Sequence, residues 1–280
     1  MTVNGVLSTA LLGVILLIIC TVLYFGGWSA PAHVGELRYS LQRRLPGEEC
    51  HTTCPVVGLE SISQYRAYIS TIETNCTSLR QFGGHPPAPS HGRKYVCLDE
   101  RFNIKPDDCH VISFGVNHEW SFEDDVAKFG CKVYAFDPTM GVKDHKRSAN
   151  IQFYATGIGN YKGLMKIGSG LRKVDRYENL VNQLGLAGRV IDCVKIDVEL
   201  SEVYFLQDVV FNSPHLLRKI KQIAMEVHHG GGVDLNPKSL FLVYWPYFMI
   251  LRCHGFRIIA SRSGNNERTQ EIVWAREEQW

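Results

Sequence analysis

The chain has 280 residues, of which 45% are hydrophobic and 21% are charged, and this composition is ordinary for a globular protein. Thirty Lys and Arg residues against 28 Asp and Glu residues leave a formal net charge of +2, without the basic excess typical of nucleic-acid-binding proteins. We therefore expect no nucleic-acid partner, and the length suits one sizeable folded domain with additional segments.

The first 30 residues are expected to form a hydrophobic membrane anchor. No Asp, Glu, Lys or Arg occurs from Met1 to Ala32, and the apolar stretch over residues 6–25 has the length of a bilayer-spanning helix. A cleaved signal peptide is the alternative, but the stretch is long for such a peptide and no basic residue precedes it. We predict a retained single-pass transmembrane helix in residues 1–30, with the lipid bilayer as the partner of residues 6–25.

The sequence gives conflicting signals about the side of the membrane on which the rest of the chain lies. Arginines follow the hydrophobic stretch, and the positive-inside rule then favours the cytosol. Eight cysteines, an even number, lie outside the stretch, and a glycosylation sequon begins at Asn75, as suits a compartment where disulfides form. We favour the lumenal or extracellular side of the secretory pathway. We expect Cys131 and Cys193 to be buried apolar side chains within or beside strands.

Residues 31–90 are expected to form a stem or linker. The segment begins at Pro31 and ends in a stretch rich in glycine and proline, and residues 59–79 have the pattern of an amphipathic helix. From residue 91 on, short apolar runs alternate with helical patterns. We therefore place a single α/β domain over residues 91–280.

The elements of this domain follow one another in a regular order. Ser121 is expected to cap one helix, with Asp124 three residues later as in a capping box, and Pro246 is expected to kink or split the last helix. Alternating strands and helices of these lengths predict a Rossmann-like, mostly parallel sheet, and the last two strands predict an antiparallel hairpin. The predicted strands are 109–114, 132–136, 151–154, 193–196, 223–225, 256–260 and 271–275, and the predicted helices are 121–129, one that closes over 180–186, and two that begin near 213 and 236.

A glycine or an acidic residue directly follows each of four predicted strands. These residues are Gly115, Asp137, Asp197 and Glu226. In a doubly wound parallel sheet, ligands bind outside the carboxyl ends of the strands, where the strand order reverses. The four side chains are therefore predicted to lie around one cleft.

Gly115, Asp137 and Asp197 are the predicted cofactor-binding residues. Gly115 permits a tight turn and a close approach of the backbone to a ligand, and Asp137 follows at about the 20-residue spacing at which a carboxylate reaches a ribose diol. Asp137 can alternatively serve only as a turn former before Pro138. The missing G-x-G-x-x-G pattern counts against an NAD enzyme, and the missing D-x-D triplet counts against a nucleotide-sugar enzyme.

Two pairs of motifs carry a resemblance to known families. Residues 111–122 (VISFGVNHEWSF) and 134–138 (YAFDP) resemble the methyltransferase-like protein 24 family. Residues 194–199 (VKIDVE) and 223–228 (IAMEVH) are similar to FkbM-type methyltransferases. The resemblance covers about residues 90 to 280. It implies a seven-stranded fold that binds S-adenosylmethionine and transfers its methyl group to an acceptor that the resemblance does not identify.

Methyl transfer depends chiefly on positioning, and an oxygen or nitrogen acceptor can also need a general base. Glu199, Glu226 and His228 are the predicted catalytic candidates for that role. His228 can alternatively be an ordinary hydrogen-bonded residue at a strand end. Asp197, Glu199, His228 and His229 can alternatively hold a divalent metal, but their spacing is not diagnostic, and we predict no metal site.

One residue departs from the FkbM-type pattern. These chains usually carry a glycine where this chain has Leu200. If the backbone freedom of that glycine is needed, binding can survive while catalysis is altered or lost. We predict a membrane-anchored S-adenosylmethionine-dependent methyltransferase, and the alternative is a catalytically degenerate binding module of the same fold.

Overall fold

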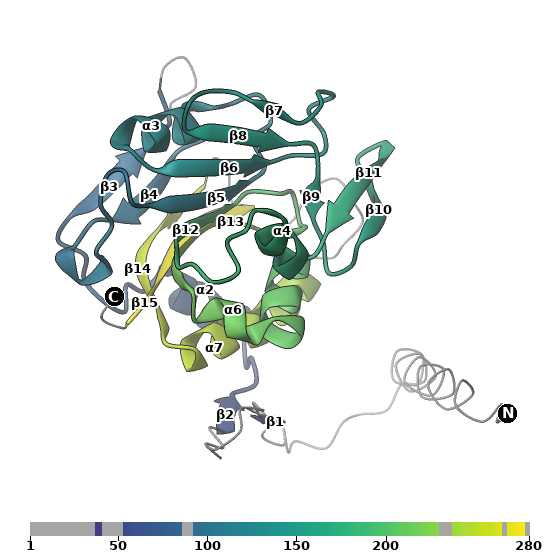
Figure 1. Ribbon diagram of the computed structural model, residues 1–280. Helices are drawn as coiled ribbons and strands as arrows, with labels where there is room; N and C mark the ends of the chain where they lie inside the picture. Colours follow the sequence, from purple (N-terminus) through teal and green to yellow (C-terminus); the bar gives the residue numbers. More distant parts are fainter. Residues whose placement is uncertain (1–36, 41–52, 86–91, 230–236, 265–267, 278–280) are drawn as a thin grey trace, which may run out of the picture. The chain divides into compact units, whose positions relative to one another are not determined.

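A computed structural model of the chain describes residues 37–40, 53–85, 92–229, 237–264 and 268–277 (Figure 1). The predicted anchor in residues 1–30 lies outside these residues. Within the described ranges, no helix combines the length and the apolar character needed to cross a bilayer.

An eight-stranded mixed sheet forms the centre of the domain, in the order β14-β15-β13-β12-β5-β6-β8-β7 (Figure 1). The predicted Rossmann-like α/β fold with its C-terminal antiparallel hairpin is confirmed, and a two-residue edge strand raises the expected seven strands to eight. The parallel strands are β5 (His110–Phe114), β6 (Lys132–Phe136), β8 (Ile151–Tyr154), β12 (Ile191–Ile196) and β13 (Ile220–His228). The antiparallel strands are β7 (His145–Lys146), β14 (Phe256–Ser263) and β15 (Thr269–Arg276).

The strand order reverses at β5. The chain leaves β5 toward β6 and β8 on one side, and later returns to β12 and β13 on the other side. Phe114, the last residue of β5, is in register with Phe136 of β6 and Ile196 of β12. The three strands therefore end level, and the residues that follow them emerge at the same edge of the sheet.

Side chains alternate between the two faces of the sheet, and each face has its own hydrophobic core. Ile112 and Phe114 of β5 pack in one core, whereas Val111 packs in the other. The first core is covered by α2 (Ile62–Ser70), α4 (Tyr177–Gln183), α5 (Glu202–Gln207) with the π-helical turn η2 (Asp208–Asn212), α6 (Pro214–Leu217) and α7 (Pro237–Cys253). The second is covered by α3 (Ser121–Phe129), the 3₁₀ turn η1 (Glu100–Phe102) and the paired strands β3 (Leu79–Phe82) and β4 (Lys94–Cys97).

Besides the β3–β4 pair, the described part of the chain contains two further small sheets. Strands β9 (Gly157–Ile158), β10 (Gly163–Ile167) and β11 (Gly170–Asp175) form a three-stranded sheet in a region for which the sequence predicted no strand. Strands β1 (Leu37–Ser40) and β2 (Thr53–Val56) form an antiparallel pair.

Part of the segment assigned to a stem is packed into the domain. Of the helix expected over residues 59–79, only Ile62–Ser70 is helical, and its Tyr65 and Ile69 are buried in the first core. Phe82 of β3 is buried in the second core. The folded unit therefore includes residues well before position 91.

One local prediction about helices is wrong, and of a second, that Pro246 kinks or splits the last helix, only the split is excluded. Trp120 occupies the N-cap position of α3, and the Ser121 hydroxyl instead accepts a hydrogen bond from the backbone N–H of Gly84 at 2.8 Å. Helix α7 is not split, because it continues through Pro246 from residue 237 to residue 253. Tyr244 and Phe248 of α7 are fully buried, and this packing offsets the hydrogen bond that proline cannot make.

Cys131 is buried in the second core directly before β6, as predicted, and it also forms a disulfide with Cys109, which was not predicted. Cys109 and Cys131 directly precede the paired strands β5 and β6, so the register of the sheet brings them together. Cys193 is a free, buried thiol, as predicted. Cys253 is disulfide-bonded as well.

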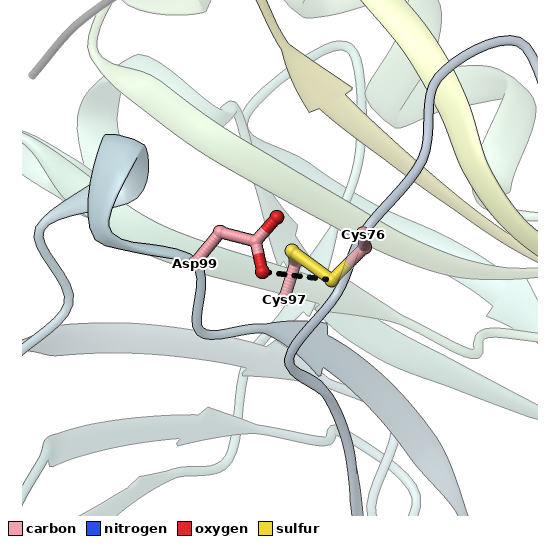
Figure 2. A group of neighbouring side chains, drawn as sticks. All are labelled: Cys76, Cys97 and Asp99. Carbon is pink, nitrogen blue, oxygen red and sulfur yellow. Dashed lines mark hydrogen bonds between the residues drawn. A yellow bond between two sulfur atoms is a disulfide. The ribbon is translucent and has the colours of Figure 1, made fainter.

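A second disulfide joins Cys76 to Cys97 at the end of β4 (Figure 2). Asp99 lies beside it, with one carboxylate oxygen 3.8 Å from the Cys76 sulfur. The same carboxylate accepts hydrogen bonds from the backbone N–H groups of Thr77 and Ser78. The segment before β3 is thus attached to β4, the strand that carries Lys94.

Candidate active site

A cleft of about 470 Å³ opens at the carboxyl ends of β5, β6, β12 and β13. The prediction that one cleft at this edge collects the predicted cofactor-binding residues is confirmed. The predicted catalytic residues line the same cleft, while the chemical roles of both groups stay predictions. The six residues are Gly115, Asp137, Asp197, Glu199, Glu226 and His228.

Position 115 requires glycine because the chain passes close to the end of β12 as it leaves β5. Its φ is +83°, and a Cβ added to it would lie 1.7 Å from the carbonyl oxygen of Asp197. Buried Lys195, on β12, donates a hydrogen bond to the Gly115 carbonyl. The missing side chain of Gly115 therefore makes room for the neighbouring backbone, and the turn that follows it is held in place from β12.

Asp137 fixes the turn that follows Gly115. One carboxylate oxygen accepts the backbone N–H groups of Val116 and Asn117, both at 2.9 Å. The other accepts the backbone N–H of Thr139 at 2.8 Å and the hydroxyl of the same residue at 2.5 Å. Asp137 is thus a turn-forming residue, which was the alternative role expected for it. It also lines the cleft, as a cofactor-binding residue must.

Glu119 is a cleft residue that the sequence reasoning missed. One of its carboxylate oxygens accepts the backbone N–H of Ser121 at 3.1 Å. The other is buried and has no hydrogen-bond partner among the residues that the structure describes. Because a buried carboxylate oxygen without a donor is costly, this atom suits a cationic ligand in the cleft. Its position in the turn after the first strand was the only signal in the sequence.

Lys94 was also missed, and it is a buried cation that pairs with two carboxylates of the cleft, Asp197 and Glu226. Its buried ammonium lies 2.9 Å from Glu271, 3.1 Å from Asp197 and 3.7 Å from Glu226. Burial disfavours the charged form, but the three carboxylates outweigh it and raise the pKa of Lys94 above its ordinary value. A charged residue in the otherwise apolar strand Lys94–Cys97 was the available signal.

The pKa values of Asp197 and Glu226 are shifted in opposite directions. Burial disfavours the Asp197 carboxylate, but Lys94, Lys195 and His228 outweigh that effect and hold the pKa of Asp197 below its usual range. Burial and the negative charge of Asp197 raise the pKa of Glu226 to about 7. Glu226 therefore exchanges a proton near neutral pH, as a general base must.

His228 is held as a cation by Glu202, a fully buried residue of α5 that the sequence reasoning missed. The ring atom Nδ1 lies 2.7 Å from one Glu202 oxygen, and the Tyr244 hydroxyl donates to the other at 3.2 Å. Burial alone lowers the pKa of His228, but Glu202, Glu199 and Asp197 outweigh it and raise the pKa to about 9. At neutral pH the ring is protonated, so it is a poor candidate for the base.

Three of the four residues considered as metal ligands come together. One ligand atom each from Asp197, Glu199 and His228 lies within 4.8 Å of the other two. His229 takes no part, because its ring atom Nε2 pairs with the Tyr65 hydroxyl at 3.0 Å. Burial and the charge of His228 lower the pKa of His229 to about 4.

Leu200 keeps the backbone conformation that the glycine of the FkbM-type pattern allows. Its φ is +78°, and Glu199 before it has a φ of +49°. Leu200 packs against the first core, which offsets the strain of a left-handed conformation. The replacement therefore does not remove the sharp turn that brings Glu199 to the cleft.

The sequence matches a family described as methyltransferase domain over residues 48–260. A relative named "Probable methyltransferase-like protein 24" from Homo sapiens is 26% identical over 216 residues, which cover 72% of this chain and 57% of the relative. The protein of the same name from Rattus norvegicus is 24% identical over 213 residues, which cover 68% and 54%. The chain thus spans a little over half the length of these curated relatives.

The chain also matches solved structures at low sequence identity. An rRNA methylase from Streptococcus thermophilus is 12% identical, with 64% of this chain and 92% of that chain covered and a TM-score of 0.36. Fibrillarin from Aeropyrum pernix, solved with natively bound S-adenosyl-L-methionine, is 13% identical, with 73% and 97% covered and a TM-score of 0.37.

Proposed function

Since this chain belongs to the family of methyltransferase domains, we propose that it transfers a methyl group from S-adenosylmethionine to an acceptor in the cleft at the ends of β5, β6, β12 and β13. The observation that carries this proposal is the convergence of Gly115, Asp137 and Asp197 where the strand order reverses. This is the place at which doubly wound sheets bind their ligands.

The charges of the cleft fit this methyl donor. The donor supplies an electrophilic methyl group on a positively charged sulfur, and it also carries an ammonium group. The unpartnered oxygen of Glu119 suits that ammonium group. Asp137 already accepts four hydrogen bonds, two on each oxygen, which fill the roughly four acceptor positions of a carboxylate. A ribose hydroxyl therefore binds Asp137 by taking the place of one of these donors, such as the Thr139 hydroxyl.

Glu226 is the general base of this proposal. Its pKa of about 7 allows it to accept a proton near neutral pH, whereas His228 is already protonated there. The acceptor atom forms a bond to the methyl carbon as its proton passes to Glu226. The electron pair of the broken carbon–sulfur bond remains on the sulfur, which becomes a neutral thioether.

Binding of the donor is the first test. Calorimetric titration of the full-length chain, purified in detergent, is expected to show one saturable site for S-adenosylmethionine. Glu119→Gln should weaken binding about tenfold or more, because it removes a charge-assisted hydrogen bond worth about 1.5 to 3 kcal/mol. Exposed Glu60 provides the control, because Glu60→Gln should bind like the unmodified chain. A properly folded chain that takes up no donor would contradict the proposed function.

We also propose that residues 6–25 anchor the enzyme in a membrane and that the domain lies on the lumenal or extracellular side. The charge-free apolar length of these residues supports the anchor. The Cys76–Cys97 and Cys109–Cys131 disulfides support an oxidising compartment. In sealed microsomes, protease added outside should leave the domain intact, and carbonate washing should leave the chain in the membrane. Digestion without detergent would contradict the orientation, and release by carbonate would contradict the anchor.

A further inference from the structure

Three side chains converge on one point at the wall of the cleft. A carboxylate oxygen from Asp197, another from Glu199 and a ring nitrogen of His228 lie within 4.8 Å of one another. Two atoms that bind the same cation at about 2.1 to 2.5 Å can be at most about 5 Å apart. The three atoms can therefore share one cation, and a set of three protein ligands leaves coordination positions open.

The ring of His228 is oriented from behind by a buried carboxylate. Glu202 pairs with Nδ1 of the ring at 2.7 Å, and Glu202 is itself held by the Tyr244 hydroxyl and by the backbone N–H of Val198, each at 3.2 Å. Nε2 of the ring then lies 3.5 Å from Glu199. Metal-binding histidines almost always have their second nitrogen paired in this way, which fixes the ring and increases its basicity. The cation takes the place of the proton on Nε2, so its binding releases that proton to the solvent.

An independent observation comes from the neighbouring strand. Thr269 on β15 lies opposite His228 in the register of the sheet and lines the same cleft. Its hydroxyl oxygen is buried and has no hydrogen-bond partner in the described part of the chain. This hydroxyl lies beside Gly264, and it is a further polar atom that lacks a partner among the described residues that line this end of the cleft.

We propose that Asp197, Glu199 and His228 bind one divalent cation of the Mn²⁺ type, and that this cation holds a hydroxyl oxygen of the methyl acceptor. The second part rests on the proposed function. Two carboxylates with one imidazole suit Mn²⁺ or Zn²⁺ better than Ca²⁺, which prefers six to eight oxygen ligands. A cation at this position stabilises the negative charge that develops on the acceptor oxygen as its proton leaves. The site therefore favours hydroxyl acceptors over amines.

Binding of Mn²⁺ itself provides the test. The full-length chain, treated with chelator and titrated with Mn²⁺, is expected to bind one ion, measured as loss of the free-ion signal in electron paramagnetic resonance. Glu199→Gln and His228→Gln should each weaken binding at least tenfold. The Glu199 side chain is 81% exposed, so its variant should fold normally. Exposed Glu60 gives the matched control, and Glu60→Gln should leave binding unchanged.

The failures of the two proposals are distinguishable. No bound Mn²⁺, or equal binding by Glu199→Gln and the unmodified chain, would overturn the cation site. Binding of S-adenosylhomocysteine is measured separately by calorimetry on the chelator-treated chain. A chain that binds this product but no Mn²⁺ refutes only the cation site, whereas a chain that binds Mn²⁺ but neither donor nor product supports the cation site and contradicts the proposed function.

Discussion

The Cβ position of Gly115 faces the carbonyl oxygen of Asp197, and a carbon placed there would lie 1.7 Å from that oxygen. The obstacle is backbone rather than a flexible side chain, so it cannot move aside without displacing the end of β12. Gly115→Ala is therefore expected to lower the free energy of unfolding by about 3 kcal/mol or more. Urea unfolding with intact disulfides measures this loss.

Gly141 offers a matched control for that substitution. Its φ is +70°, close to that of Gly115, but a Cβ there would meet nothing within 4 Å. Gly141→Ala should cost only the conformational penalty of about 1 to 2 kcal/mol. Equal losses for the two variants would show that the contact with Asp197 is not what requires glycine at position 115.

Replacement of Asp137 is expected to affect both folding and donor binding. Asp137→Ala leaves the N–H groups of Val116 and Asn117 without their acceptor, which should cost about 2 to 4 kcal/mol of unfolding free energy. The folded fraction should bind S-adenosylmethionine about tenfold more weakly, because a charge-assisted bond to ribose is lost. Thr139→Val, which removes only the 2.5 Å hydroxyl bond, should cost about 1 kcal/mol. Undiminished affinity in folded Asp137→Ala would leave Asp137 with a structural role alone.

The pairing of His228 with Glu202 should make stability depend on pH. The pKa of His228 rises from an ordinary value of about 6.5 to about 9 in the folded chain. The folded state thus binds this proton more tightly than the unfolded state does, so the stabilisation is complete below about pH 6.5 and is lost as pH rises through about 9. Between pH 6 and pH 10, the stability advantage over His228→Gln should fall by on the order of 2 to 3 kcal/mol. A constant advantage across this range would refute the protonated pair.

Titration of Glu226 should be visible without knowledge of the acceptor. Carbon-13 NMR of labelled glutamate carboxyl groups should show a signal with a midpoint near pH 7 that is missing in Glu226→Gln. Glu271→Gln should lower this midpoint, because it removes a neighbouring negative charge and keeps an acceptor for Lys94. If every glutamate signal titrates below about pH 5, Glu226 is not the base at neutral pH.

The sequence predicted best those features that depend on neighbouring residues along the chain. Helix α3 and strands β6 and β8 have the bounds that their apolar patterns predict. Residues that directly follow a strand, such as Asp137 and Asp197, can be located once the strands are known. Parallel strands then bring them to one edge of the sheet, so the candidate cofactor-binding residues needed no tertiary information beyond the fold class.

Only the tertiary structure decided which distant groups complete the site. Lys94 reaches Asp197 across 103 positions of the chain, and Glu202 reaches His228 from a different element. The Cys109–Cys131 disulfide depends on the register of two strands. These pairings depend on burial and strand register, which are properties of contacts between distant segments rather than of local sequence periodicity. The sequence could therefore indicate where the cleft is, but the protonation states within it follow from groups that only folding brings together.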